Sequence, residues 1–200
     1  MKNLKNALLI MAILAAVFPL LTCTSLENKT KSPSYIVVEA LKGTTAAGLA
    51  AEFLQSDVQE INTTTSQPFV TSDTATATLS AHTLDPQPIV GTSQYEDVLL
   101  TRYVVHYFRA DGKNVEGVDV PYSFEGSMNV LLKINIATDV ALVVVRDVAK
   151  MEEPLINLVS SRDVGVLQVT ARIDFYGHDM DNNTVTATGD LPVFFANYND

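Results

Sequence analysis

Apolar runs rich in Val, Ile, Thr and Tyr recur from Tyr35 to the end of the chain, separated by Gly, Pro, Asn and Asp. This spacing is typical of strands and turns. The runs predict strands at 35–41, 57–61, 74–84, 98–109, 127–136, 140–150, 165–176, 184–188 and 191–195. Because both faces of 98–109 are apolar, that strand is expected inside a sheet. Several short strands without alternating helices favour an antiparallel sandwich over an α/β sheet.

The segments between these strands give further expectations. Strands 127–136 and 140–150 are predicted to pair as a hairpin, and Gly189-Asp190 to interrupt the last strand. Residues 46–55 are Ala-rich, and 152–159 begin with two acids and a proline, so both are expected to be helical. The 166 residues from 35 to 200 exceed the roughly 100 of an immunoglobulin domain, which predicts elaborated loops around 43–72 and 110–126. The predicted fold is an all-β, immunoglobulin-like antiparallel β-sandwich with one or two short helices.

The amino-terminal segment has the pattern of an export signal. Lys2 and Lys5 precede an apolar run of 15 residues, from Ala7 to Leu21. Such a run is short for a spanning helix, which needs about 20 apolar residues, and fits the apolar region of a signal peptide. The run ends in Leu20-Leu21-Thr22-Cys23. This ending resembles the lipobox of bacterial lipoproteins, in which Leu stands three positions before an invariant Cys. The family more often has Gly, Ala or Ser where Thr22 stands.

The resemblance implies that residues 1–22 are a signal peptide and that Cys23, the only cysteine, carries the lipid. Two or three acyl chains there would give a stable membrane anchor. Residues 23–34 would form a flexible tether to a domain at 35–200. Thr24, rather than Asp, follows the lipidation site, which in some Gram-negative bacteria implies delivery to the outer membrane. The alternative is an ordinary cleaved signal with a chance cysteine.

Charge and cysteine content exclude several classes of protein. The net charge of −10 argues against nucleic-acid binding, which needs clustered Lys and Arg. Because residues 1–22 contain two lysines and no acid, the remaining 178 residues carry 11 basic and 23 acidic side chains, a net charge of −12. A single cysteine excludes a disulfide framework, a Cys-rich zinc site and an iron–sulfur cluster within one chain.

The best metal candidate is the segment that begins at Asp179. Asp179, Asp181 and Asn183 occupy positions one, three and five of a calcium-type loop, and Asp190 falls at position twelve. Thr184 stands where such loops have Gly, and Asp190 where they have Glu. The competing interpretation is a polar hairpin turn with a left-handed Asn182 or Asn183. The turn is the favoured interpretation.

No catalytic constellation is visible in the sequence. There is no G-x-S-x-G motif, no H-x-H or H-E-x-x-H, and the three histidines, His82, His106 and His178, are far apart. His106, inside a predicted strand, is expected to be a packed or paired side chain. We therefore expect neither an enzyme nor a cofactor beyond the covalent lipid, with calcium the less favoured possibility.

Two further segments carry a resemblance. RADGKNVEGVDVPYSFEG (109–126) and RDVAKMEEPL (146–155) are similar to segments of uncharacterised secreted bacterial proteins of the β-sandwich type. The likeness covers about a fifth of the chain and implies a fold but no activity.

The leading functional expectation is a lipid-anchored, non-enzymatic binding or scaffolding protein of the cell envelope. One alternative is a subunit of a surface filament or adhesin, with Pro192–Phe195 as a strand donated to a neighbour. Another is a calcium-dependent envelope hydrolase that uses residues 178–190. The partner and the oligomeric state stay open.

Overall fold

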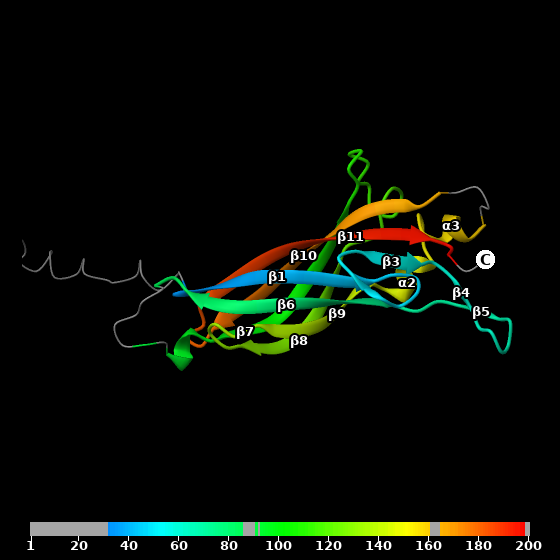
Figure 1. The fold of residues 1–200 in the computed structure, drawn as a ribbon. Coiled ribbons are helices and arrows are strands. Elements are labelled where there is room, and N and C mark those ends of the chain that lie inside the picture. Colours follow the sequence, from blue (N-terminus) through cyan, green and yellow to red (C-terminus); the bar gives the residue numbers. More distant parts are fainter. Residues whose placement is uncertain (1–31, 86–90, 92, 161–164, 199–200) are drawn as a thin grey trace, which may run out of the picture. The chain divides into compact units, whose positions relative to one another are not determined.

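The computed structural model describes residues 32–85, 91, 93–160 and 165–198, which form two packed β-sheets (Figure 1). The first sheet has the order β2 (Ala50–Ala51), β1 (Ser34–Thr44), β6 (Asp73–Thr83), β9 (Thr138–Val145). The second has the order β3 (Leu54–Asp57), β11 (Thr184–Ala196), β10 (Leu167–Asp179), β7 (Val98–Phe108), β8 (Phe124–Leu132). The remaining elements are the β4–β5 ribbon (Glu60–Ile61, Pro68–Phe69), η2 (Gln94–Glu96), α2 (Asp147–Lys150) and α3 (Ile156–Ser160).

The connectivity follows the immunoglobulin plan. Strands β1, β6 and β9 occupy the places of A, B and E, while β7, β10 and β11 occupy those of C, F and G, with β8 added beside β7. All pairings between these strands are antiparallel, and only β3 joins β11 in parallel. The predicted all-β sandwich with two short α-helices is therefore confirmed, and β7 lies inside its sheet as expected.

Residues 127–136 and 140–150 do not form the predicted hairpin. β8 pairs with β7, whereas β9 pairs with β6 in the opposite sheet. Each strand buries one apolar face, so the connection 133–137 carries the chain across the core instead of turning back on itself. The strand also stops at Val145, because the next residues form α2.

Two other local predictions were wrong. Residues 46–55 are not helical: a turn with Gly48 at a φ of 76° leads into β2 and β3. β11 runs without a break through Gly189 and Asp190, paired with β10 from Phe195 back to Thr184. A ladder of this length outweighs the local preference of one glycine for a turn. Pro192–Phe195 consequently belongs to an interior strand of its own domain, between β10 and β3.

Two tyrosines of β7 close the open side of the sandwich between edge strands β8 and β9. Tyr103 accepts at its hydroxyl a hydrogen bond of 3.2 Å from the backbone N–H of Val143, and Tyr107 donates to the carbonyl of Val144. Gly126 makes room for this crossing, because a Cβ there would lie 2.3 Å from the Tyr103 ring. We call these two tyrosines with Gly126 the tyrosine seam. It occupies backbone groups of an edge strand that could otherwise pair with another chain.

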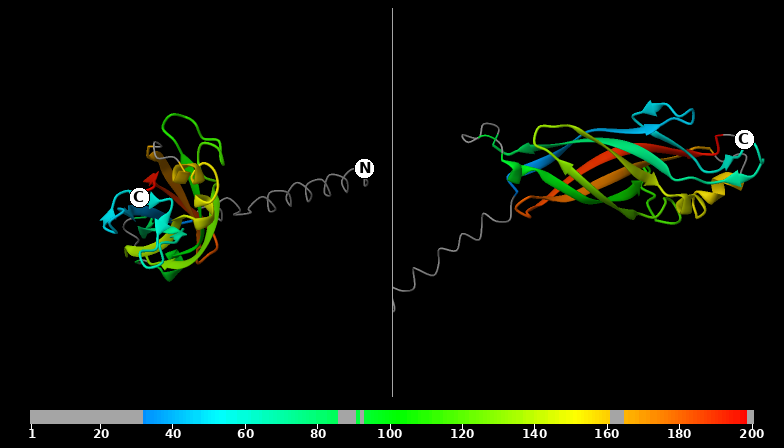
Figure 2. Two further views of the ribbon diagram at one scale, coloured as in Figure 1. Left: turned by 90° about the vertical axis from the view of Figure 1, so that its right-hand side faces the viewer. Right: turned by 90° about the horizontal axis from the view of Figure 1, so that it is seen from below.

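The sandwich has two ends that differ in their connections (Figures 1 and 2). The entry end contains the start of β1, where the described chain begins, the η2 segment, and the connections 133–137 and 180–183. The distal end contains the connections 58–72, 109–123 and 146–160, with β4, β5, α2 and α3. The loops predicted around 43–72 and 110–126 both reach this end, whereas the long connection after β9 was not predicted as a loop. None of the helices among the described residues has the length and apolar character to span a bilayer.

Candidate functional site

Cys23, the predicted lipidation site, lies outside the described residues. The first described residues are already held in the domain. The backbone N–H of Ser34 donates to the Ser32 hydroxyl (3.0 Å), and the Ser34 hydroxyl donates to the Glu96 carbonyl (2.7 Å). Residues 32–34, which belong to the segment expected to be a tether, are thus bonded to the domain.

The predicted calcium segment forms the turn between β10 and β11, organised by the fully buried Asp179. Its Oδ1 accepts the backbone N–H groups of Asp181 (3.0 Å) and Asn183 (2.8 Å), and the Asn183 amide donates to both carboxylate oxygens. Burial by itself raises the pKa of Asp179, but the hydrogen bonds from Asn183, the Ser32 hydroxyl and the Asp181 N–H lower it below its ordinary value. Asn182 has a φ of 65°, as the turn interpretation predicts.

The structure does not bring the four candidate calcium ligands together. Asp190 lies opposite Arg172, far along the β10–β11 ladder from the turn, and its carboxylate accepts a bond of 3.1 Å from the Arg172 Nε. The oxygens of Asp179 face protein donors, and the Asp181 side chain is exposed. Among the described residues, no three His, Cys, Asp or Glu side chains are grouped so as to hold a metal ion.

The three histidines are also separated. His82 contacts the Ser80 hydroxyl and the Asn135 amide oxygen, and His178 contacts the carbonyl of Asp179. His106 contacts the Ser123 hydroxyl at 2.9 Å and lies 3.8 Å from the carboxylate of Asp174. His106 is a paired strand residue, as predicted, and its hydroxyl neighbour also donates to Glu116, so this serine is part of a loop contact.

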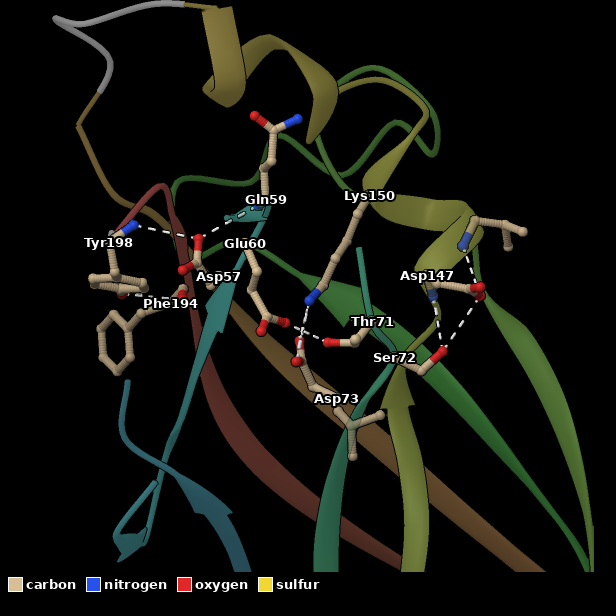
Figure 3. A network of polar contacts seen from close by, with 12 residues as sticks. Asp57, Gln59, Glu60, Thr71, Ser72, Asp73, Asp147, Lys150, Phe194 and Tyr198 are labelled. Carbon is tan, nitrogen blue, oxygen red and sulfur yellow. Dashed lines mark hydrogen bonds and ion pairs between the residues drawn. The ribbon is translucent and has the colours of Figure 1, made fainter. Parts of the chain in front are cut away.

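The distal end contains a polar network that sequence analysis missed (Figure 3). Lys150, the last residue of α2, is 1% exposed, and its Nζ lies 3.1 and 3.0 Å from the two carboxylate oxygens of Asp73 at the start of β6. Beside this ion pair, the Thr71 hydroxyl donates to Glu60, and Ser72 exchanges hydrogen bonds with Asp147. The only sign of it in the sequence was that Lys150 stood at the end of the predicted apolar strand 140–150.

Burial governs the electrostatics of this network. Desolvation raises the pKa of Asp73, and the positive charge of Lys150 acts against that rise. Burial similarly raises the pKa of Asp57, whose carboxylate accepts the N–H groups of Tyr198 and Gln59. Because the amine of Lys150 is enclosed, a substrate cannot reach it. The network joins α2 to β6 and is a structural staple, which we call the distal staple.

The loop 109–123 between β7 and β8 stands away from the sandwich (green in Figure 1). It is tightly bonded within itself. The carbonyl of Val115 accepts three backbone N–H groups, from residues 118, 119 and 120, and the Asp119 carboxylate accepts the Val115 N–H. Gly117, with a φ of 74°, leaves space for the ring of Tyr122, whose hydroxyl would lie 2.3 Å from a Cβ at that position. Val120 is fully buried and fixes the loop to the core.

This ordered loop exposes three large apolar side chains, those of Val115, Val118 and Tyr122. We call the segment 109–123 the presenting loop. Loops of this length are uncommon in compact domains and are often functional. A loop already fixed in one conformation loses little entropy when it binds, which favours recognition of an apolar surface. The sequence predicts a loop here, but no pattern in it indicates the internal hydrogen bonds that fix the loop.

No known protein family matches the sequence, and no curated protein matches it. The arrangement of the described residues is consequently the basis for inferring a function.

Proposed function

We propose that this protein is a lipid-anchored, non-enzymatic binding protein of the cell envelope, held through Cys23 at the outer membrane. The observation that carries the proposal is the presenting loop, which exposes Val115, Val118 and Tyr122 from a rigid backbone. The lipobox-like ending Leu20–Cys23 supports the anchor. The domain would be a rigid support that holds this loop near the membrane surface.

Binding is favoured over catalysis by the nature of the described side chains. Asp179 and Lys150 are the most enclosed charged groups, and both are bonded to protein partners. The presenting loop offers apolar side chains in one segment with the exposed charged residues Asp111, Lys113 and Glu116. An apolar centre with a polar rim is the usual arrangement of a protein-recognition surface. The partner expected here is an envelope protein with an apolar pocket.

The anchor is tested by expressing the full chain in a Gram-negative host. Mass spectrometry of the amino-terminal peptide should show a diacylglyceryl thioether on Cys23, and the protein should partition into the detergent phase. The Cys23→Ser variant should lack the modification and partition into the aqueous phase. An unmodified Cys23 in the wild-type protein would refute the anchor.

The presenting loop is tested by cross-linking in the same cells. Wild-type protein should give a defined cross-linked partner, and the double variant Val115→Asp/Val118→Asp should lose it without a change in thermal stability. Val148→Asp is the matched control, because Val148 is also exposed but lies on α2. A partner captured equally by all three proteins would show that the loop is not the binding element.

A further inference from the structure

The entry end carries exposed apolar side chains beside the point where the chain enters the domain. Leu84 follows β6, and its N–H donates to the carbonyl of Pro33 (2.7 Å). Tyr95 lies in η2, and its carbonyl accepts the N–H of Met180 from the β10–β11 turn (3.2 Å). The exposed large apolar residues of this end are Tyr35, Leu84, Tyr95, Leu131, Ile136 and Met180.

Three of these side chains line one shallow hollow. Tyr95, Leu131 and Met180 surround it together with Gln94, Asp97 and Lys133, and its volume is about 610 Å³. The hollow is formed by three segments far apart in sequence: η2, the end of β8 and the β10–β11 turn. Hydrogen bonds fix all three, since the Asp97 carboxylate also accepts the backbone N–H of Ile134 (3.1 Å). The apolar surface is therefore part of the folded end.

The position of this surface relative to Cys23 determines what can cover it. Ser32 follows Cys23 by nine positions, a segment that spans at most about 30 Å when fully extended. With a lipid on Cys23, the entry end would always lie within that distance of the bilayer. A short covalent connection raises the effective concentration of the second contact to the millimolar range. Even a weak apolar surface would then be occupied by lipid.

We infer that the entry end rests on the lipid surface, with Tyr95, Leu131 and Met180 inserted at the level of the headgroups. This inference depends on the lipid anchor of the proposed function. A tyrosine beside aliphatic side chains and a lysine is a combination suited to the membrane interface, where an apolar body and a polar tip are both solvated. The contact would hold the sandwich in one orientation and direct its distal end away from the membrane.

The charges of the entry end specify the lipid class. Asp85 and Asp181 are exposed there and Glu96 is half-buried, against one exposed Lys or Arg among the described residues of this end, Lys133. An acidic surface is repelled by anionic headgroups, and this repulsion is screened by salt. Zwitterionic headgroups are consequently the preferred surface.

The absence of tryptophan from the chain provides a direct test. Tyr95→Trp places a fluorophore at the entry end, and Tyr122→Trp is the matched control, because both tyrosines are exposed (66% and 48%) but Tyr122 lies on the presenting loop. The full chain is reconstituted into phosphatidylcholine vesicles that contain a brominated phosphatidylcholine as quencher. The Tyr95→Trp protein should lose most of its fluorescence and shift to the blue, and the Tyr122→Trp protein should not change.

Equal quenching of both variants, or no quenching of Tyr95→Trp, would overturn the membrane contact. Mass spectrometry of the Cys23 peptide is run on the same sample, so that a missing lipid is recognised as a failure of the anchor. In that case the chain is coupled to a maleimide lipid through Cys23, its only thiol, and the quenching still decides the contact. Replacing half of the lipid by phosphatidylglycerol at low salt should reduce the quenching, and an increase would refute the apolar, zwitterionic contact.

Discussion

Different kinds of interaction stabilise the connections at the two ends of the sandwich. At the entry end, Asp179 accepts N–H groups from residues two and four positions ahead of it in the same turn. At the distal end, Lys150 reaches Asp73 across 77 positions of sequence. The β10–β11 turn at the entry end is thus fixed by local hydrogen bonds, and α2 at the distal end by one buried ion pair between distant segments.

This difference shows which of the two elements needs contacts with distant parts of the chain in order to keep its structure. A turn stabilised by its own residues keeps its form whenever the two strands beside it are paired. α2 at the distal end has no such independent support, since it is only four residues long and a helix of that length is not stable alone. Loss of the Lys150–Asp73 pair should therefore affect the whole protein more than loss of any bond at the entry end.

The largest effect is expected from Lys150→Met, which keeps the volume of the side chain and removes its charge. Asp73 would then be a buried carboxylate without its cation, and the free energy of unfolding should fall by about 3–5 kcal/mol at neutral pH. Urea unfolding followed by circular dichroism measures this loss. Because burial already raises the pKa of Asp73, protonation should relieve the unpaired charge, and the loss should be smaller near pH 3.8.

The control is the double variant Lys150→Met/Asp73→Asn, which removes both charges. It should recover much of the lost stability, because the cost arises from the unpaired charge and not from the missing bond. A Lys150→Met protein as stable as the wild type would show that the distal end does not depend on this pair.

A smaller effect, about 2 kcal/mol, is expected from Asp179→Ala at the entry end. The variant removes the acceptor of two backbone N–H groups and of the Asn183 amide. The expected loss is about that of one hydrogen bond to a charged group, 1.5–3 kcal/mol, because residues 181 and 182 are exposed and water can bond to the freed donors. The folded-state pKa of Asp179 is lowered, so its stabilising contribution is present at neutral pH and is lost as the pH falls below 3.8. Urea unfolding should show that wild type and variant converge in acid.

Asp181→Ala is the matched control for Asp179→Ala, because Asp181 belongs to the same turn but has an exposed side chain. Its stability should equal that of the wild type. An equal loss in both variants would mean that the turn depends on its overall charge and not on the buried carboxylate.

The same distinction, between interactions of residues close in sequence and interactions of residues far apart, explains what could be predicted from the sequence. Alternating apolar residues gave β7 and β10 almost to their ends, and the polar residues 179–183 gave the turn with a left-handed asparagine. These features depend on neighbours in the chain. The placement of β8 and β9 in different sheets depends on which strands each one meets across the core, and no local pattern encodes that choice.

At the candidate site, too, the features set by neighbouring residues could be predicted and those set by distant residues could not. A loop around 110–126 was predicted because the domain is longer than a minimal immunoglobulin domain, but the conformation of the presenting loop is fixed by bonds to Val115 and by the fit of Tyr122 over Gly117. The burial of Lys150 could not be predicted, because lysine is usually exposed and its partner lies in a strand much earlier in the chain. In both cases the property depends on tertiary contacts, which the sequence does not reveal.

The smallest effect is expected at the tyrosine seam. Burial raises the pKa of both Tyr103 and Tyr107 above the ordinary value of 10.0, so the folded protein keeps these protons at a pH where the unfolded chain loses them. Stability should therefore decline as the pH rises above 10, the opposite of the acid loss at Asp179. Tyr103→Phe should cost about 1 kcal/mol at neutral pH, the net value of the bond to Val143. The same variant should show a shallower alkaline decline in urea unfolding, and Tyr122→Phe, on an exposed ring, should match the wild type at every pH. A Tyr103→Phe protein with the wild-type alkaline profile would mean that Tyr103 does not contribute to the decline.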